Sequence, residues 1–134
     1  MEIDYIALFV TNVERSLIFY RDVLGFRFDK PAKPDSAEGY SGKLKIGLYD
    51  RAWLPKLFGD RGEQKISGNP FLLSMSVENL DQVYQELSDR QSLYPVNMIA
   101  PPRVMPWGQR ILFLSDPDDN LLEIVQSSTA STDN

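Results

Sequence analysis

The stretch that decides the fold is Asp4-Tyr-Ile-Ala-Leu-Phe-Val-Thr-Asn-Val-Glu-Arg-Ser-Leu-Ile-Phe-Tyr-Arg-Asp-Val-Leu-Gly-Phe26. Its first part, Ile3 to Val10, is largely apolar on both faces, which predicts a strand that is covered on both sides. Asn12 is a favourable N-cap for a helix, and Gly25 is placed to end that helix. The stretch therefore predicts a strand that leads directly into a helix.

The predicted helix has one apolar stripe. Its members recur at helical spacing and are Val13, Leu17, Tyr20 and Leu24. Glu14 lies in the first turn and Arg21 in the last turn, where the helix dipole favours an acid and a base, respectively. We expect the stripe to pack against a sheet.

The same pattern returns half a chain length later, in Phe71-Leu-Leu-Ser-Met-Ser-Val-Glu-Asn-Leu-Asp81. Asn79 repeats the cap, and Gln82 stands three residues further on, as in a capping box. A second apolar stripe follows at Leu80, Tyr84 and Leu87. Two copies of one strand–helix unit are therefore expected.

Strand, turn and helix signals fill the rest of each copy. The first copy is expected to continue with a strand over 26–30, two strands or one bent strand over 40–50, and a short helix over 52–58. The second is expected to continue with a strand or loop near 96–99, a strand over 109–115, a turn over 116–120 and a strand over 121–126. The predicted fold class is α+β, with two βαβββ modules that form a cupped mixed sheet and carry their helices outside.

The predicted domain organisation is a single domain over 1–134. It divides into a first module, 1–58, a linker, 59–69, and a second module, 70–126. The small polar residues of 127–134 predict a disordered tail.

Composition narrows the classes of function. The 134 residues are 43% hydrophobic and 25% charged, which is typical of a globular protein. The sequence has no apolar segment long enough to cross a bilayer, and it lacks the basic start of a signal peptide. We therefore expect a cytoplasmic protein without membrane association. The absence of cysteine excludes disulfides and thiolate chemistry, and the absence of histidine removes the usual general base and metal ligand. A formal net charge of −5 argues against a nucleic-acid partner and suits a cationic small molecule.

Two long motifs resemble the vicinal oxygen chelate superfamily, which is also called the glyoxalase/bleomycin resistance/dioxygenase family. They are Val10-x-Asn-Val-x-Arg-Ser-x-x-Phe-Tyr-x-x-Val-Leu-Gly-Phe26 and Trp107-Gly-x-Arg-x-x-x-x-x-Asp-Pro-Asp-x-Asn-Leu-Leu-Glu-Ile124. A weaker repeat, Val77-Glu-Asn-Leu-Asp81, lies between them. The resemblance spans nearly the whole chain, and it implies a homodimer.

The resemblance also implies four inward-facing positions that hold a metal ion in the family's metalloenzymes. In this sequence those positions fall on Tyr5, Gly47, Leu72 and Glu123. One carboxylate without an imidazole hardly holds a divalent ion, so we expect neither a metal site nor another cofactor.

Strand alternation indicates which residues face the cavity that the resemblance implies. If Tyr5 faces the concave side, then Tyr49, Ser74 and Glu123 also face it. Lys45 would share that face. Such a surface would be aromatic and apolar with a few polar points, which is the ordinary composition of a ligand site.

Each candidate residue also has a purely structural interpretation. Tyr5 and Tyr49 could pack in the core or at a rim, and Trp53 and Trp107 could cap the surface instead of stacking on a planar or cationic ligand. Glu123 could form a salt bridge with Arg110 or Lys45. The predicted ligand-binding set is Tyr5, Tyr49, Trp53, Ser74, Trp107, Arg110 and Glu123, with Trp107 and Glu123 expected in one site.

The function that these observations favour is a metal-independent protein that binds a small molecule, a drug or metabolite of cationic or planar character. It would resemble bleomycin-resistance proteins, which sequester a compound and thereby confer antibiotic resistance. The alternative is a glyoxalase- or dioxygenase-like enzyme with an atypical or lost metal site, in which Glu123 is the only candidate catalytic residue.

Overall fold

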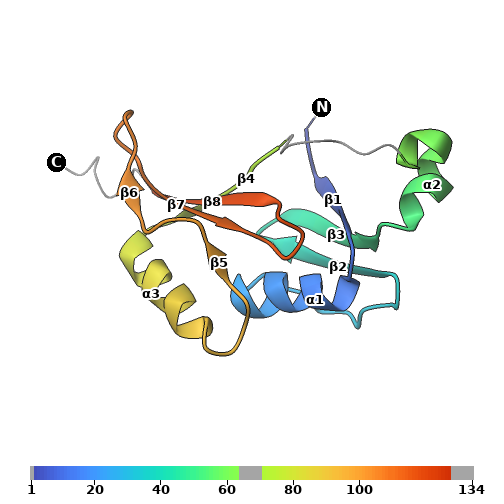
Figure 1. Ribbon diagram of the computed structural model, residues 1–134, viewed down its shortest axis with the longest axis horizontal. Coiled ribbons are helices and arrows are strands. Elements are labelled where there is room, and N and C mark those ends of the chain that lie inside the picture. The colour runs from blue at the N-terminus through green and yellow to red at the C-terminus, as the bar shows by residue number, and fades with distance from the viewer. Residues whose placement is uncertain (1, 64–70, 128–134) are drawn as a thin grey trace. The chain divides into compact units, whose positions relative to one another are not determined.

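The computed structural model describes residues 2–63 and 71–127. The chain divides into two compact units, Met1–Ser67 and Gly68–Asn134. The described strands form a three-stranded sheet in the first unit and a five-stranded sheet in the second (Figure 1). The predicted α+β class is therefore confirmed. Residues 64–69 of the predicted linker and 128–134 of the predicted tail lie outside the described residues.

The first unit begins as the sequence predicts. Strand β1 (Tyr5–Val10) leads into helix α1 (Val13–Ile18), which continues as a π-helical turn, η1 (Phe19–Val23). The Asn12 side chain caps α1 by accepting a hydrogen bond of 2.9 Å from the Arg15 amide. Gly25 ends the segment with a φ of 80°.

The helix stripe is largely as predicted. Val13, Leu17 and Tyr20 are buried. Phe19 and Val23, the first and last residues of the π-helical turn, are buried as well.

Two further strands complete the first sheet. They are β2 (Ser36–Ser41) and β3 (Leu44–Asp50), which turn at Gly42 with its φ of 58°. The strand order is β1-β3-β2, with β3 parallel to β1 and antiparallel to β2.

The strand predicted over 26–30 is wrong. Among the described residues of that stretch, only Arg27 pairs, in a single bridge with Tyr40. A loop that contains Pro31 and Pro34 follows at once, and proline has no N–H group with which to extend a ladder.

Helix α2 (Trp53–Phe58) follows β3, as predicted, and passes into a 3₁₀ turn, η2 (Gly59–Glu63). None of the α2 residues is buried. Trp53 Nε1 donates a hydrogen bond of 3.1 Å to Asp35 Oδ2, and the Phe58 ring meets Phe9 edge-on at 6.3 Å between centroids. These two contacts help to hold α2 against the first sheet.

The second unit repeats the arrangement. Strand β4 (Leu73–Val77) precedes helix α3 (Leu80–Arg90), which Asn79 caps by accepting a hydrogen bond of 3.0 Å from the Gln82 amide. The remaining strands are β5 (Asn97–Met98), β6 (Arg103–Val104), β7 (Arg110–Ser115) and β8 (Leu121–Gln126). Their order is β4-β8-β7-β5, with β6 also paired to β7 and β4 parallel to β8.

Helix α3 and one side of the second sheet together form the core of the second unit. Leu80 and Leu87 are almost completely buried, as are the residues that alternate on one side of the sheet: Leu112, Leu114, Leu122 and Ile124. No helix in 2–63 or 71–127 is both long enough and apolar enough to cross a membrane.

The aspartates after β7 form a turn, as predicted. Asp116 Oδ1 accepts hydrogen bonds of 2.9 Å from the Asp118 and Asn120 amides. Asp119 adopts a left-handed conformation with a φ of 63°, which aspartate tolerates. The turn joins β7 to β8.

Candidate functional site

The first sheet has one face packed under α1 and one face turned away from it. Leu8, Ile46 and Leu48 point towards α1 and are buried. Residues at the alternating positions point the other way and form what we call the first open face. Its members are Tyr5, Ala7, Phe9, Ser36, Glu38, Tyr40, Lys45, Gly47 and Tyr49.

Three side chains from three strands meet on this face. The Tyr5 hydroxyl donates a hydrogen bond of 2.9 Å to Glu38 Oε2 and lies 2.7 Å from the Tyr49 hydroxyl. Tyr49 lies 3.4 Å from the same carboxylate oxygen. The Tyr49 hydroxyl is the donor in this longer contact, and either oxygen can be the donor in the contact between the two hydroxyls.

Gly47 makes room for this cluster. It is buried in the middle of β3, and a Cβ atom at this position would overlap the Tyr5 hydroxyl and collide with the Tyr49 ring. The glycine therefore leaves room for the close approach of Tyr5, from the neighbouring strand β1, and Tyr49, from β3 itself.

The hydrogen bonds polarise the cluster. Burial, followed by the hydrogen bonds with Tyr49 and Glu38, raises the pKa of the Tyr5 phenol well above its usual range. The hydrogen bond from Tyr5 lowers the pKa of the Glu38 carboxyl, and the nearby charge of Lys45 lowers it further. At neutral pH the first open face presents an ionised Glu38 carboxylate beside the neutral phenol of Tyr5.

Aromatic rings extend the cluster towards α2. Phe9 lies 6.1 Å from Tyr49 between ring centroids, and the edge-on contact of Phe9 with Phe58 continues the row of rings to α2. Phe58 remains about half exposed, at 52%. The carboxylate therefore lies beside an aromatic surface that a ligand can reach.

The second sheet also has a face turned away from α3, and we call the part of it that carries Ser74, Glu123 and Phe113 the second open face. Further along the same face, Ile111 and Val125 are buried together with Met105. On the second open face the Ser74 hydroxyl donates a hydrogen bond of 2.9 Å to Glu123 Oε2, and Phe113 lies opposite Glu123 on the neighbouring strand. The Arg103 guanidinium lies 6.0 Å from the centroid of the Phe113 ring. This second open face contains one carboxylate and no tyrosine partner among the described residues.

Some of the residues predicted from the sequence come together and others do not. Tyr5 meets Tyr49, and Ser74 meets Glu123. Arg110 forms two hydrogen bonds with Asp81, of 2.9 and 3.1 Å, so the salt bridge considered between Arg110 and Glu123 is not present.

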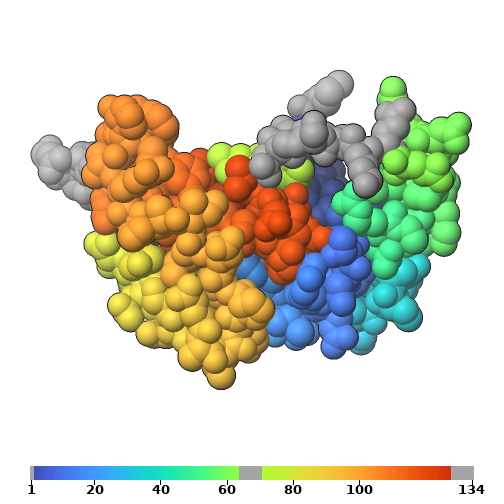
Figure 2. All heavy atoms as spheres, in the orientation of Figure 1, coloured from blue at the N-terminus to red at the C-terminus, as the bar shows by residue number. Residues whose placement is uncertain are grey.

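Both tryptophans lie outside the Tyr5 cluster. Trp53 is engaged with Asp35, and Trp107 donates a hydrogen bond to Gln109 in the turn between β6 and β7, where it is 66% exposed. The turn projects from the second unit (Figure 2). Glu123 pairs with Phe113, three residues into β7, whereas Trp107 lies in the turn before that strand begins, so the two groups are separated by more than about 10 Å of strand. The structure does not bring Trp107 and Glu123 together.

Sequence reasoning missed Glu38, which is the acceptor at the centre of the cluster. The prediction starts the strand pair at Tyr40, so it gives residues 37–39 no strand. The alternation of small and large residues in Ser36-Ala-Glu-Gly-Tyr-Ser41 is the signal that indicates the longer strand.

The metal-ligand positions implied by the resemblance do not fit a divalent ion. The Tyr5 hydroxyl is bonded to Glu38 and Tyr49, Gly47 has no side chain, and Leu72 is apolar, which leaves the Glu123 carboxylate. Within 2–63 and 71–127, no three Asp, Glu, His or Cys side chains gather closely enough to hold an ion. Such a donor set is too poor for zinc, nickel, manganese or iron.

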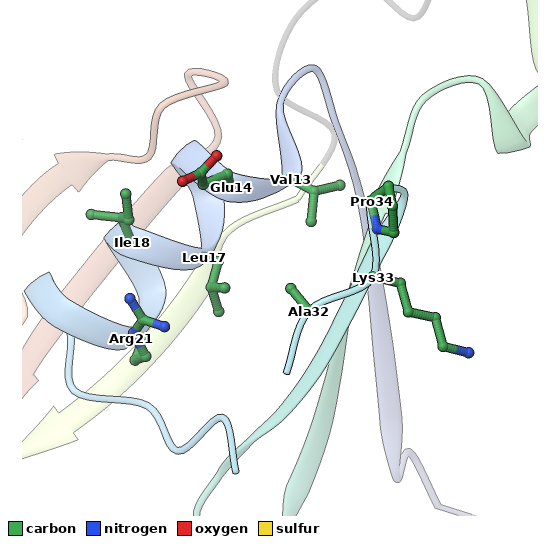
Figure 3. Close-up of a pocket in the computed structure, with 8 residues that line it drawn as sticks. All are labelled: Val13, Glu14, Leu17, Ile18, Arg21, Ala32, Lys33 and Pro34. Atoms are coloured by element: carbon green, nitrogen blue, oxygen red, sulfur yellow. The ribbon is translucent and has the colours of Figure 1, made fainter. Parts of the chain in front are cut away.

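A pocket of about 450 Å³ lies on the other side of the first unit, between α1 and the loop before β2. Leu17 of α1 and Ala32 of the loop face the same space (Figure 3). Among its charged lining residues, Arg21 is paired with Asp22 at 2.8 Å, and Lys33 points away from the helix (Figure 3). None of the residues predicted for ligand binding lines this pocket.

Comparisons with known proteins agree with the fold. Residues 3–129 match the sequence profile of the Glyoxalase-like domain. The uncharacterized protein YraH of Bacillus subtilis (strain 168) is 29% identical over 128 residues, which cover 92% of this chain and 97% of YraH.

Two solved structures are similar over almost their whole length. A glyoxalase/bleomycin resistance protein/dioxygenase family enzyme from Burkholderia phytofirmans PsJN has a TM-score of 0.79 and 21% identity, covering 94% of this chain and 98% of that one. A member of the same superfamily from Sphaerobacter thermophilus DSM 20745 has a TM-score of 0.70 and 27% identity, covering 95% and 98%. This chain therefore belongs to the glyoxalase-like domain family, within the glyoxalase/bleomycin resistance/dioxygenase, or vicinal oxygen chelate, superfamily.

Proposed function

We propose that this protein binds an organic small molecule, a drug or a metabolite, on the first open face, and that binding needs no metal ion. The observation that carries the proposal is the convergence of Tyr5, Glu38 and Tyr49 from three strands. Phe9 and Phe58 continue this cluster as an aromatic surface. An apolar surface with a few directed polar groups is the usual composition of a ligand site.

Sequestration suits these groups better than turnover. The Tyr5 phenol holds its proton, and the hydroxyls of Tyr5 and Tyr49 are already hydrogen-bonded. The chain also has neither histidine nor cysteine to act as a base or nucleophile. The protein would then act as bleomycin-resistance proteins do, by holding a compound. A cytoplasmic location is part of this proposal.

A glyoxalase- or dioxygenase-like enzyme is the alternative. The observation that favours it is Glu123, which keeps a carboxylate at one of the family's ligand positions and is oriented by Ser74. The relative from Burkholderia phytofirmans is described as an enzyme, but at 21% identity the likeness supports the fold alone.

Calorimetric titration with drug- and metabolite-sized aromatic compounds, before and after treatment with a chelator, tests the two functions. Binding that survives chelation and is weakened by Tyr5→Phe or Tyr49→Phe supports the proposal. Ser74→Ala is the matched control, because it removes one hydroxyl from the second open face. Binding or turnover that needs added metal and is lost in Glu123→Gln would instead establish the enzyme.

We also propose that the protein forms a homodimer. Among the described residues, β1 pairs with β3 alone and so keeps an unpaired edge that a second copy can cover. The outer edge of β2 is partly covered by the bridges from Arg27 and Lys33. Light scattering at micromolar concentration should give twice the mass of the chain. A monomer mass would contradict the dimer and leave the binding proposal intact.

A further inference from the structure

The two oxygens of Glu38 have different partners. Oε2 accepts the hydrogen bond from Tyr5 and lies near the Tyr49 hydroxyl, whereas Oε1 faces the ammonium group of Lys45 at 3.6 Å. Oε2 is therefore hydrogen-bonded to the tyrosines, and Oε1 faces a cation.

Lys45 is held loosely in this place. A charge-assisted hydrogen bond between an ammonium and a carboxylate is ordinarily about 2.7–2.9 Å long, so the contact of 3.6 Å is an ion pair without a tight hydrogen bond. The Lys45 and Glu38 side chains are 39% and 40% exposed, and water competes for both. Exposed pairs of this kind contribute little to stability.

The same ammonium group also lies near an aromatic ring. Lys45 Nζ is 5.9 Å from the centroid of the Tyr5 ring, at the outer limit of a cation–π contact. The neighbouring ring in the row, that of Tyr40, is already covered by the Arg27 guanidinium at 4.8 Å. The space between Glu38 Oε1 and the Tyr5 ring thus accepts an ammonium group, and the chain's own lysine occupies it.

We infer that Glu38 and Tyr5 form an ammonium subsite, which Lys45 occupies in the unliganded protein and from which a ligand's protonated amine displaces it. The inference rests on the proposed function and names its ligand class, an amine attached to a flat apolar body. The amine meets Glu38 Oε1, and the body lies along Tyr49 and Phe9, which occupy the next row of the first open face.

The distances on the sheet suit a compact ligand. Successive residues on one face of a strand are about 6.6 Å apart, and this is the spacing between the row that contains Glu38 and the row that contains Phe9 and Tyr49. A ligand whose amine is one or two bonds from an aromatic ring spans these two rows. The displaced Lys45 returns to water on its flexible stem. Its loss from Glu38 costs little because the original pair is weak.

Calorimetry with four probes of one shape tests the subsite: benzylammonium, benzyltrimethylammonium, benzyl alcohol and benzoate. The expected order of affinity for the wild-type protein has benzylammonium first, because it alone combines a positive charge with N–H donors. Glu38→Gln should weaken benzylammonium by roughly 2–30-fold and leave benzyl alcohol unchanged.

Lys45→Met gives the sharpest outcome, because removal of the competing ammonium should raise the affinity for benzylammonium by up to about fivefold. Lys30→Met is the matched control, since it removes the same charge from an exposed loop residue of the same unit. Melting temperatures of all variants verify folding. Lys45→Arg, which keeps a cation in place, should bind the probe as the wild-type protein does.

Two results overturn the inference in distinguishable ways. If Lys45→Met and Lys30→Met change the affinity for benzylammonium equally, the effect is one of net charge and the subsite is wrong, whereas the binding face stands. If all four probes fail to bind both the wild-type and the Lys45→Met protein, the inference fails together with the proposed function.

Discussion

Strands β1-β3-β2 of the first sheet and β4-β8-β7 of the second share their order and directions, but they carry different groups at equivalent positions of their open faces. The register aligns a row of three residues across the middle of each sheet: Ala7, Gly47 and Glu38 in the first, and Ser74, Glu123 and Phe113 in the second. The carboxylate lies on the central strand in the second unit. In the first unit it lies on the neighbouring strand, and the central position is glycine.

This exchange changes what each face can do. Without a side chain at Gly47, the hydroxyls of Tyr5 and Tyr49 reach Glu38 above the strand. In the second sheet the position equivalent to Gly47 carries the side chain of Glu123, which accepts a hydrogen bond from Ser74. The absence of a side chain at Gly47 thus allows three side chains from three strands to meet, where the second sheet has a carboxylate bonded to one serine.

The largest effect is expected for Gly47→Ala, which introduces the side chain that the first open face lacks. Overlap with the Tyr5 hydroxyl should lower the free energy of unfolding by about 1–3 kcal/mol in chemical denaturation. In a Tyr5→Ala background much of this cost should disappear, because the overlapping atom is gone. An equal cost in both backgrounds would show that Tyr5 is not the obstacle.

The next effect concerns alkaline pH. The pKa of Tyr5 is raised in the folded state, so the folded protein holds a proton that the unfolded chain loses above about pH 10. Stability should therefore fall as the pH rises above that value, by at most about 1.4 kcal/mol per pH unit for this one proton. Tyr5→Phe should show a shallower fall in urea unfolding, whereas Tyr84→Phe, which removes a hydroxyl from α3, should follow the wild-type protein.

A smaller effect is expected in acid. The pKa of Glu38 is lowered in the folded state, so its contribution is present above the unfolded value of about 4.3 and is lost as the pH falls through the folded value. Because Glu38 is partly exposed, we expect less than about 1 kcal/mol. The stability difference between the wild-type protein and Glu38→Gln should shrink as the pH is lowered from 7 to 3, and a difference that is constant with pH would contradict this.

The smallest effect is expected for metal ions. A ligand that binds only the folded state raises stability by RT ln(1 + [L]/Kd), and a site with one carboxylate should have a Kd far above the added concentration. Zinc, nickel, manganese or iron at tens of micromolar should leave the melting temperature nearly unchanged. A clear rise that Glu123→Gln abolishes would restore the second open face as a metal site.

Local signals predicted most elements of the fold. The caps Asn12 and Asn79, the final strand β8 and the turn at Asp119 depend on residues within a few positions of one another. Local preferences and hydrophobic periodicity capture such features. The strand predicted over 26–30 is wrong because strand formation depends on pairing with residues outside the segment, and only Arg27 finds such a partner, Tyr40.

The candidate site could be predicted only in part. Alternation along a strand correctly placed Tyr5 with Tyr49, and Ser74 with Glu123, on shared faces. It could not show that Arg110 pairs with Asp81, because that contact joins the start of a strand to the first turn of a helix. Nor could it separate Trp107 from Glu123, because their spacing depends on the register of β7 against β8.

The sequence by itself determined that the chain repeats a strand–helix unit, that it belongs to an α+β class, and that histidine and cysteine chemistry is absent. These properties are set by composition and by patterns within a single element. Only the tertiary structure decided that Glu38 accepts from Tyr5 across 33 positions of sequence, over a glycine that leaves the space. Strand order and register bring these groups together, and residues within one strand cannot specify their partners on another.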